Sequence, residues 1–359
     1  MQKNIKNIDK LVFGRGSFDQ LESILSSRPE DEGGYRIFLV DHYFKGKELE
    51  SRLPARPVDH VQFIDVDPAE PTTDQIDGLR DEILNSRGLP SSVTGIGGGS
   101  ILDIAKALSL MFTNEGSSTR YQGLNLIQRP GVYHVGVPTI SGTGAEVSTT
   151  AVLTGPEKKL GLKCDWTVFN QVVLDPELIA SVPMDKWFYT GMDTYIHCIE
   201  SEQGSLNNAF SHAYAEESLK LCREIFLCQG AGKKPENDDK LMVASLMGGL
   251  SLSYSEVGVC HALSYGLSKI LGEKHCYANC LAFQHLGDYY PEGVSEFQQM
   301  MNKQGIALPQ GLSKGWSEEE MMAMSRVAYN LPHMWLHAAG TGWKDKITPD
   351  SIYSLYQRF

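Results

Sequence analysis

Residues 93–106 read VTGIGGGSILDIAK, in which a short apolar run leads through a glycine-rich turn into a helical pattern. Val93–Ile96 is typical of a buried strand. Ser100, followed three residues later by Asp103, predicts a capping box at the start of a helix. A strand joined to a helix by a tight turn is the repeating unit of parallel α/β sheets.

Similar units lie on both sides of this stretch. Residues 73–86 carry apolar side chains at helical spacing, and two short runs around Gly155-Pro156, residues 151–154 and 159–163, predict a β-hairpin. Further buried strands are predicted at Arg36–Val40, Val61–Val66, Val132–Val137 and Val172–Leu174. Because these strands alternate with helices, we expect a parallel sheet that binds its ligand beyond the carboxyl ends of the strands.

The second half of the chain has a different pattern. Beyond Pro176 the sequence shows no convincing strand, and helical periodicity is found in residues 184–201, 207–228, 238–271 and 318–331. A length of 359 residues favours roughly two domains. We therefore expect an α/β protein in which a domain built on a parallel sheet (residues 1–178) is followed by an all-helical domain (179–359).

Charge and composition exclude several classes of protein. The chain has 32 Lys and Arg against 44 Asp and Glu, and its net charge of −12 opposes binding to nucleic acid. The start of the chain is too polar for a signal peptide, and the longest apolar stretch, residues 241–255, is too short to span a bilayer. The seven cysteines include no C-x-x-C motif, which predicts reduced, buried thiols in a cytoplasmic protein.

Two loops are candidates for binding a dinucleotide. In the first, the backbone around Gly98, Gly99 and Ser100 and the start of the following helix suit a pyrophosphate, although a plain tight turn fits the same residues. In the second, residues 138–146 follow another predicted strand and contain several hydroxyls. We expect the cofactor to contact Gly98, Gly99, Ser100 and Asp103 in the first region, and Thr139, Ser141 and Thr143 in the second.

Asp41 directly follows the strand at residues 36–40. A carboxylate there suits the hydroxyls of an adenine-side ribose, which favours NAD over NADP. The same residue also fits the N-cap of a helix.

Histidines and one aspartate form the second group of candidates. Asp193 and His197 are four residues apart and lie on one face of a predicted helix, and His261 and His275 follow. One carboxylate and three imidazoles suit a divalent ion such as Fe, Zn, Co or Mn, although a single histidine is more often an ordinary core or surface residue. Each of the three histidines is next to a cysteine in the sequence. We expect these three thiols to point away from the metal, since neighbouring residues on a helix diverge by roughly 100°. They are Cys198, Cys260 and Cys276.

These patterns together resemble the iron-containing, group III alcohol dehydrogenase family. The resemblance rests on residues 97–106, 138–147, 173–176 and 191–197 and on the segment with His261 and His275, in family order. It implies an N-terminal NAD(P)-binding domain, a helical domain and a catalytic divalent metal, Fe²⁺ or Zn²⁺. The implied ligands are Asp193, His197, His261 and His275.

One position departs from the family pattern. Many members carry a second histidine four residues after the third ligand, where this chain has Tyr265. Because the ordinary pKa of tyrosine is about 10, either the metal lowers the pKa of Tyr265 or another group relays the proton.

Two stretches, residues 150–161 and 187–201, resemble one branch of the family. That branch includes an enzyme that oxidises the C8 alcohol of 3-deoxy-D-manno-octulosonate (Kdo), a sugar acid of lipopolysaccharide, to an aldehyde that a partner aminotransferase then aminates. The implied mechanism is Lewis-acid activation of the alcohol with hydride transfer to nicotinamide. Lys163, Arg120 and Arg129 are candidates for binding the substrate carboxylate, with Lys163 and Tyr265 as the catalytic candidates.

Other functions remain open at this point. A dehydrogenase of a small alcohol, aldehyde or polyol fits the same residues, and so, less well, do a lyase similar to dehydroquinate synthase and a non-catalytic metal- or nucleotide-binding protein. We expect a homodimer, the commonest soluble assembly, and neither nucleic acid nor membrane as a partner.

Overall fold

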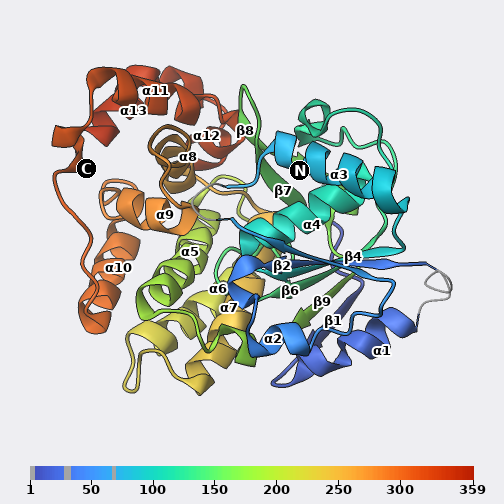
Figure 1. The fold of residues 1–359 in the computed structure, drawn as a ribbon. Coiled ribbons are helices and arrows are strands. Elements are labelled where there is room, and N and C mark those ends of the chain that lie inside the picture. Colours follow the sequence, from blue (N-terminus) through green and yellow to red (C-terminus); the bar gives the residue numbers. More distant parts are fainter. Residues whose placement is uncertain (1–4, 28–33, 67–69) are drawn as a thin grey trace. The chain divides into compact units, whose positions relative to one another are not determined.

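The computed structural model describes residues 5–27, 34–66 and 70–359, so the first four residues of the polar N-terminal segment lie outside it. The chain divides into two compact units (Figure 1). The first unit comprises residues 1–140 and 145–181, and the second comprises residues 141–144 and 182–359. The division at Ser181 lies three residues beyond the expected boundary at 178. The sequence did not predict that residues 141–144 would belong to the second unit.

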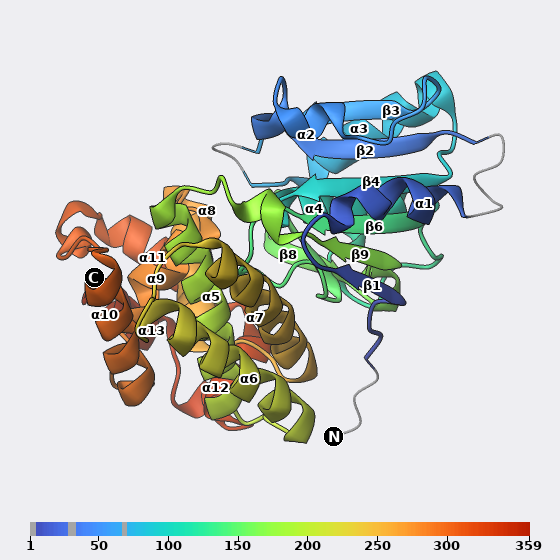
Figure 2. The same ribbon diagram turned by 90° about the horizontal axis from the view of Figure 1, so that it is seen from below.

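The first unit is built on a parallel sheet with the strand order β1-β9-β6-β4-β2-β3 (Figure 2). Its strands are β1 (Lys10–Phe13), β2 (Arg36–Asp41), β3 (His60–Ile64), β4 (Ser92–Gly97), β6 (Tyr133–Pro138) and β9 (Gln171–Leu174). Every neighbouring pair is parallel, and the register places Gly97 beside Pro138. The expected α/β class is confirmed, and only the edge strand β1 was not foreseen.

Helices cover both faces of this sheet. Figure 1 shows α3 (Thr73–Arg87) and α4 (Gly99–Met111) on one face, and α1 (Leu21–Ser26) and α2 (Glu48–Ser51) on the other. Side chains alternate along the strands, so Phe38 and Val40 of β2 pack with Leu21 and Leu25 of α1. Short 3-10 turns complete the unit at Ser17–Gln20, His42–Phe44, Ser118–Tyr121, Asp165–Thr167 and Pro176–Ile179.

The start of α4 differs from the expected capping box. Gly98 is the N-cap residue, and within the described ranges no side chain caps the helix. Asp103 does not reach back to the helix start, because its Oδ2 accepts a hydrogen bond of 3.1 Å from the Val152 N–H. A Cβ on Gly97 would lie 2.5 Å from Ile101, so this glycine allows α4 to pack closely on β4.

The predicted hairpin forms a second, small sheet in the first unit. Strand β7 (Thr150–Thr154) pairs antiparallel with β8 (Lys159–Lys163), and β5 (Gly123–Leu124) pairs parallel with β8. Lys106 of α4 holds the chain that leads into this sheet. Its fully buried ammonium donates to Ser148 Oγ at 2.9 Å and to the Thr150 carbonyl at 3.1 Å.

The second unit is helical, as expected. Its helices are α5 (Met184–Gln203), α6 (Ala209–Phe226), α7 (Pro235–Tyr254), α8 (Val259–Leu271), α9 (His275–Phe283), α10 (Pro291–Gln304), α11 (Glu318–Tyr329), α12 (Pro332–Ala339) and α13 (Pro349–Tyr356). Two short 3-10 turns lie at Leu312–Gly315 and Trp343–Asp345. The helical pattern of residues 238–271 forms two helices, because the chain leaves helical geometry between Ser255 and Gly258, a break that the pattern did not predict.

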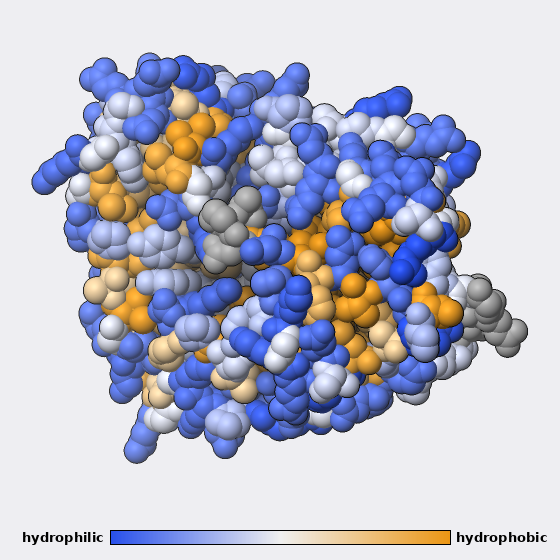
Figure 3. Space-filling model, viewed as in Figure 1, coloured by the Kyte–Doolittle hydropathy of each residue, from blue (hydrophilic) through white to orange (hydrophobic). Residues whose placement is uncertain are grey.

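Hydrophilic side chains occupy most of the face shown in Figure 3, with hydrophobic side chains in separate groups between them. The apolar residues of the second unit are largely buried around an aromatic core that includes Phe188, Phe226, Phe283 and Phe297. Among the helices of the described ranges, none combines the length and apolar character needed to cross a membrane.

His134 in β6 supports a prediction about acid stability. Its ring is buried against Phe169, and burial lowers the pKa of His134 to about 4. Because its usual pKa is about 6.5, the neutral ring stabilises the fold above pH 6.5, and this contribution is lost as the pH falls toward 4. Relative to His134→Leu, the wild-type chain should therefore lose about 2 kcal/mol of unfolding free energy between pH 8 and pH 5. Urea unfolding of both proteins at several pH values measures this loss. If the unfolding free energies of wild type and His134→Leu changed in parallel with pH, the prediction would be contradicted.

Candidate metal centre

Helix α5 carries two of the four candidate ligands. Asp193 and His197 lie one turn apart, and both side chains are buried. Gly191 lets α5 pack closely on its neighbour, because a Cβ there would lie 2.4 Å from the Phe226 ring. The helix ends at Gly204, whose N–H donates to the Glu200 carbonyl. The face that bears Asp193 is therefore held inside the helical unit.

The other two ligands begin helices. The break at residues 255–258 places His261 in the first turn of α8, and His275 is the first residue of α9. Between the two helices, Gly272 adopts a left-handed conformation with a φ of 75° and ends α8. The unexpected break thus places His261 near the start of a helix.

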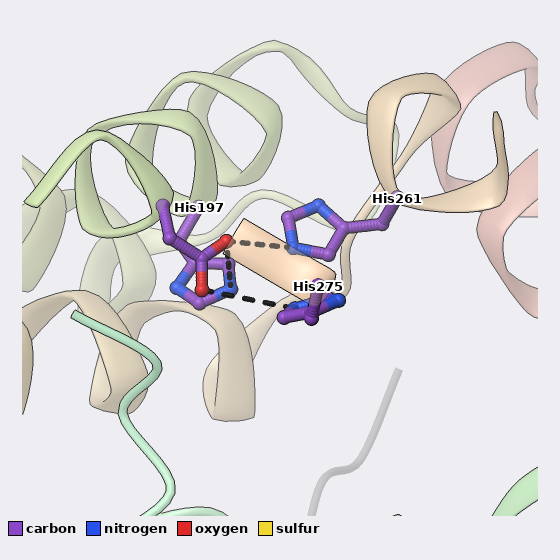
Figure 4. Close-up of side chains that lie close together, drawn as sticks. His197, His261 and His275 are labelled. Carbon is purple, nitrogen blue, oxygen red and sulfur yellow. Dashed lines mark ion pairs between the residues drawn. The ribbon is translucent and has the colours of Figure 1, made fainter. Parts of the chain in front are cut away.

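The four side chains converge on one point. Asp193 Oδ1 lies 3.7 Å from His197 Nε2 and 3.5 Å from His261 Nε2, and Asp193 Oδ2 lies 3.7 Å from His275 Nε2. Figure 4 shows the three imidazoles turned toward one carboxylate. Four donors around a small divalent ion at about 2.1 Å would be roughly 3.4 Å apart, so the observed spacing fits such an ion.

Burial and neighbouring charges shift the pKa values of the cluster's members in different directions. Burial alone would raise the pKa of Asp193, but His197, His275 and the hydrogen-bonded His261 lower it well below its usual range. Burial lowers the pKa of His197 to about 4. Burial also acts to lower the pKa of His261, yet the carboxylates of Glu200 and Asp193 raise it to about 9. An ionised carboxylate thus lies among imidazoles, and the Nδ1 of His197 is buried with no hydrogen-bond partner among the described residues.

Asn279 is a member of the cluster that sequence reasoning missed. Its Nδ2 donates to Asp193 Oδ1 at 2.6 Å and lies 3.1 Å from His261 Nε2 and 3.3 Å from His275 Nε2. The residue is fully buried on α9, four positions after His275. That spacing was the available signal, because residues i and i+4 share a helix face.

The cysteines agree only partly with expectation. All seven are free, so no disulfide is present. Burial raises the pKa of Cys198 to about 12 and that of Cys260 well above its usual value, which fits packing thiols. Cys228 is exposed, however, and Cys276 is only half-buried. The thiol of Cys276 also lies 3.4 Å from Asp193 Oδ2, so the expectation that it points away from the cluster was wrong.

The two catalytic candidates lie in different units. Tyr265 is one turn after His261 on α8, and its ring lies 6.0 Å from the His275 ring. Lys163 is the last residue of β8 in the first unit, where its carbonyl accepts from the Asn125 N–H. The structure therefore places Tyr265, but not Lys163, within the unit that contains the metal cluster.

The cofactor candidates of the first unit share one edge of the sheet. Asp41, Gly98 and Thr139 lie at the carboxyl ends of β2, β4 and β6, which are neighbours in the sheet. The uncapped start of α4 follows Gly98, so its amides are directed toward the same edge. Asp41 also acts as an N-cap, since its Oδ1 accepts from the Tyr43 N–H at 3.0 Å. Burial raises the pKa of Asp103 to about 7.

The second loop belongs partly to the helical unit. The Gly142 N–H donates to Ser245 Oγ on α7, and its carbonyl accepts from Thr194 Oγ1 on α5, at 2.8 and 2.7 Å. The predicted Ser141 and Thr143 flank this anchor, and the buried Ser141 Oγ has no hydrogen-bond partner in the described part of the chain. The glycines of this loop thus serve close packing on helices.

The three candidates for binding a carboxylate are dispersed in the first unit. Lys163 lies on the small sheet and Arg120 is exposed in the 3-10 turn at residues 118–121. Arg129 lines a cavity of about 730 Å³ together with Arg80. It precedes β6, so it lies toward the amino ends of the strands, opposite the edge that carries Gly98.

Two family models match the chain. The model described as iron-containing alcohol dehydrogenase matches residues 9–176, and the C-terminal model of the Fe-containing alcohol dehydrogenase family matches residues 187–334. The two matches correspond to the two units of the structure.

Individual proteins agree with this assignment. Sulfoacetaldehyde reductase of Bilophila wadsworthia (strain 3_1_6) is 31% identical over 71% of this chain and 66% of its own length. The chain thus spans just under two thirds of that relative. NAD-dependent methanol dehydrogenase of Bacillus methanolicus is 26% identical over 77% of this chain and 72% of its own length. 1-Propanol dehydrogenase of Citrobacter freundii is 28% identical over 77% of this chain and 70% of its own length.

Solved structures show the same fold. A 1,3-propanediol oxidoreductase has a TM-score of 0.85 at 19% identity, with 99% of each chain covered. Sulfoacetaldehyde reductase from Bifidobacterium kashiwanohense, solved with NAD⁺, has a TM-score of 0.81 at 20% identity, with 99% of this chain and 98% of that chain covered.

The loop anchored on α5 and α7 supports a prediction about stability. Gly144 has a φ of 64°, and a Cβ there would lie 2.5 Å from the Gly249 Cα. Gly144→Ala should therefore destabilise the protein by about 2–4 kcal/mol in urea unfolding, from backbone strain and overpacking together. Gly272→Ala is the matched control, because it has a φ of 75° and open space around it, and it should cost about 1 kcal/mol. Equal losses in both variants would contradict the packing role.

Proposed function

Because the chain belongs to the iron-containing alcohol dehydrogenase family, we propose that it oxidises the C8 alcohol of Kdo to the 8-aldehyde. Family membership makes the chain an oxidoreductase that acts on alcohols, with a divalent metal ion and NAD as its cofactors. The proposal concerns the substrate and the roles of individual residues.

The convergence of Asp193, His197, His261 and His275 is the observation that carries the proposal. These side chains would hold the metal, since one carboxylate and three imidazoles are hard and borderline donors that suit Fe²⁺ or Zn²⁺. When bound, the metal and NAD supply Lewis-acid activation of the alcohol and a hydride acceptor.

The residues of the chain supply orientation and proton transfer. The ligands on α5 and α8 are at most 4% exposed in their side chains, whereas His275 is 27% exposed, so water is largely excluded around the former. We assign Tyr265 to receive or relay the hydroxyl proton, because it is next to His275. Gly98, Gly99, Ser100, Asp103, Thr139, Ser141 and Thr143 would bind NAD, and Asp41 its ribose.

Two observations support an acidic substrate. Residues 150–161 and 187–201 resemble the Kdo 8-oxidase branch, and they form the β7–β8 hairpin and most of α5. The name of one relative, sulfoacetaldehyde reductase, specifies an aldehyde that bears an anionic sulfonate. Kdo is also an anion with a reactive carbon at one end. Lys163 and Arg120 are our candidates for its carboxylate.

The reaction balances as a two-electron oxidation. The carbinol carbon loses a hydride to NAD⁺ and its hydroxyl loses a proton, which gives the aldehyde, NADH and H⁺. We further propose that a separate aminotransferase consumes the aldehyde and that the enzyme acts as a homodimer.

A second candidate is a dehydrogenase of a small primary alcohol or polyol. It is favoured by relatives and structures named for 1-propanol and 1,3-propanediol. The lyase alternative is not retained, because the family consists of oxidoreductases.

Turnover by the metal-loaded protein tests the proposal. We expect NADH and an 8-aldehyde from Kdo and NAD⁺ without oxygen. We expect kcat/KM for Kdo to exceed that for 1-propanol or 1,3-propanediol by roughly 100-fold or more, since polar substrate groups pair with a matching site. NADH absorbance and trapping of the aldehyde with a hydrazine reagent provide independent readouts. Repeating the assay in air without added NAD⁺ shows whether a retained nicotinamide is recycled by oxygen.

Turnover of the simple alcohols without Kdo would replace the proposal with the second candidate. Absence of turnover with every substrate, despite bound metal, would contradict both.

A further inference from the structure

Glu200 is a buried carboxylate next to the metal cluster that is not itself one of its four donors. It is 1% exposed, and its Oε2 lies 2.5 Å from His261 Nδ1. Its Oε1 accepts from the Cys260 N–H at 2.6 Å and from the Tyr290 hydroxyl at 3.4 Å. Every one of these partners lies outside α5, so Glu200 joins α5 to other parts of the helical unit.

Burial of this carboxylate needs an explanation. A buried charge is costly unless it is paired, and neither lysine nor arginine pairs with Glu200 among the described residues. Its only ion-pair partner there is His261. The interaction with His261 is therefore what compensates for the burial of the Glu200 carboxylate.

The contact determines which nitrogen of His261 carries a proton. Because Glu200 accepts at Nδ1, that nitrogen is protonated, and Nε2 keeps its lone pair in the neutral ring. Asn279 Nδ2 lies 3.1 Å from Nε2, where it can donate to the same lone pair. Nε2 also faces Asp193. The contacts with Glu200 and Asn279 thus favour the form in which His261 can bind a metal, with its Nε2 lone pair free.

Helix geometry makes Glu200 suitable for this role. Asp193, His197 and Glu200 are spaced i, i+4 and i+7, so they lie on one face of α5. Through the Cys260 N–H, Glu200 also caps the first turn of α8, where no side chain of its own segment does so. One residue therefore sets both the start of α8 and the orientation of its ligand.

We infer that Glu200 is a positioning residue of the metal site, which holds His261 in its metal-binding tautomer and supplies the second negative charge that, with Asp193, balances a divalent ion. The inference rests on the metal site of the proposed function and adds a residue to it.

Glu200→Gln tests this inference sharply. A glutamine that presents its oxygen to the Cys260 N–H must turn its NH₂ toward His261 Nδ1, which forces the proton onto Nε2, facing the cluster. The opposite orientation leaves the Cys260 N–H against an NH₂ group. We expect Glu200→Gln to bind Zn²⁺ or Co²⁺ 10–100-fold more weakly in chelator competition, to release it faster and to alter the Co²⁺ absorption spectrum.

Glu202→Gln is a matched control on the same helix. Glu202 makes a similar contact, 2.6 Å from His212 Nδ1, but His212 is exposed and is no part of the cluster. Its removal should leave metal affinity, release rate and spectrum unchanged. A loss of affinity in both variants would indicate a general charge effect and overturn the inference.

Wild-type affinity and spectrum retained in Glu200→Gln would also overturn it. If the wild-type chain binds no metal, the proposed function fails first, which separates the two outcomes. If Glu200→Gln does not fold, ¹⁵N NMR of histidine in the Zn²⁺-loaded wild-type protein decides. We expect a protonated, slowly exchanging Nδ1 on His261, and a protonated Nε2 would refute the inference.

Discussion

The buried carboxylate of Asp193 is the group around which the helical unit is organised. Its two oxygens face imidazoles from α5, α8 and α9 and the amide of Asn279. A carboxylate with no exposed surface is stable as an ion only where such partners surround it. The position of three helix segments is therefore coupled to one charge, and the same charge makes the cluster suitable for a divalent cation.

Close packing of a loop against two helices also supports this arrangement. The loop at residues 141–144 leaves the first unit and is bonded to α5 and α7 through Gly142. Thr194, which binds the Gly142 carbonyl, directly follows Asp193 in the sequence. The loop that carries the predicted cofactor residues Ser141 and Thr143 is thus fixed to the helix that carries Asp193 and His197.

Much of this could be predicted because the relevant signals are local. The strands of the parallel sheet are short apolar runs between turn residues, and Asp193 and His197 show the i, i+4 spacing of one helix face. The edge strand β1 was missed because its side chains are mostly exposed and lack the apolar pattern of the buried strands. Asp103 was misread because the Val152 N–H, 49 residues away, competes for its carboxylate.

The remaining errors concern tertiary contacts. The sequence keeps its helical periodicity across residues 255–258, so it gives no sign of the break between α7 and α8. A contact of Glu200 with the start of α8 stabilises the new helix. Glu200 lies seven residues after Asp193 and Asn279 four residues after His275, so each shares a helix face with a predicted ligand. Polar residues at such spacings are common on helices, so the spacing alone did not identify them. Helix geometry alone predicted that Cys276 points away from its neighbour His275, yet its thiol contacts Asp193 of another helix.

Anomalous X-ray diffraction from crystals of the Zn²⁺-loaded protein tests the central claim most directly, because it locates the ion without assumptions about activity. We predict one strong peak per chain, at about 2.0–2.2 Å from a carboxylate oxygen of Asp193 and from one nitrogen each of His197, His261 and His275. A peak elsewhere in the chain, or one bound by the thiol of Cys276 in place of a histidine, would contradict the account.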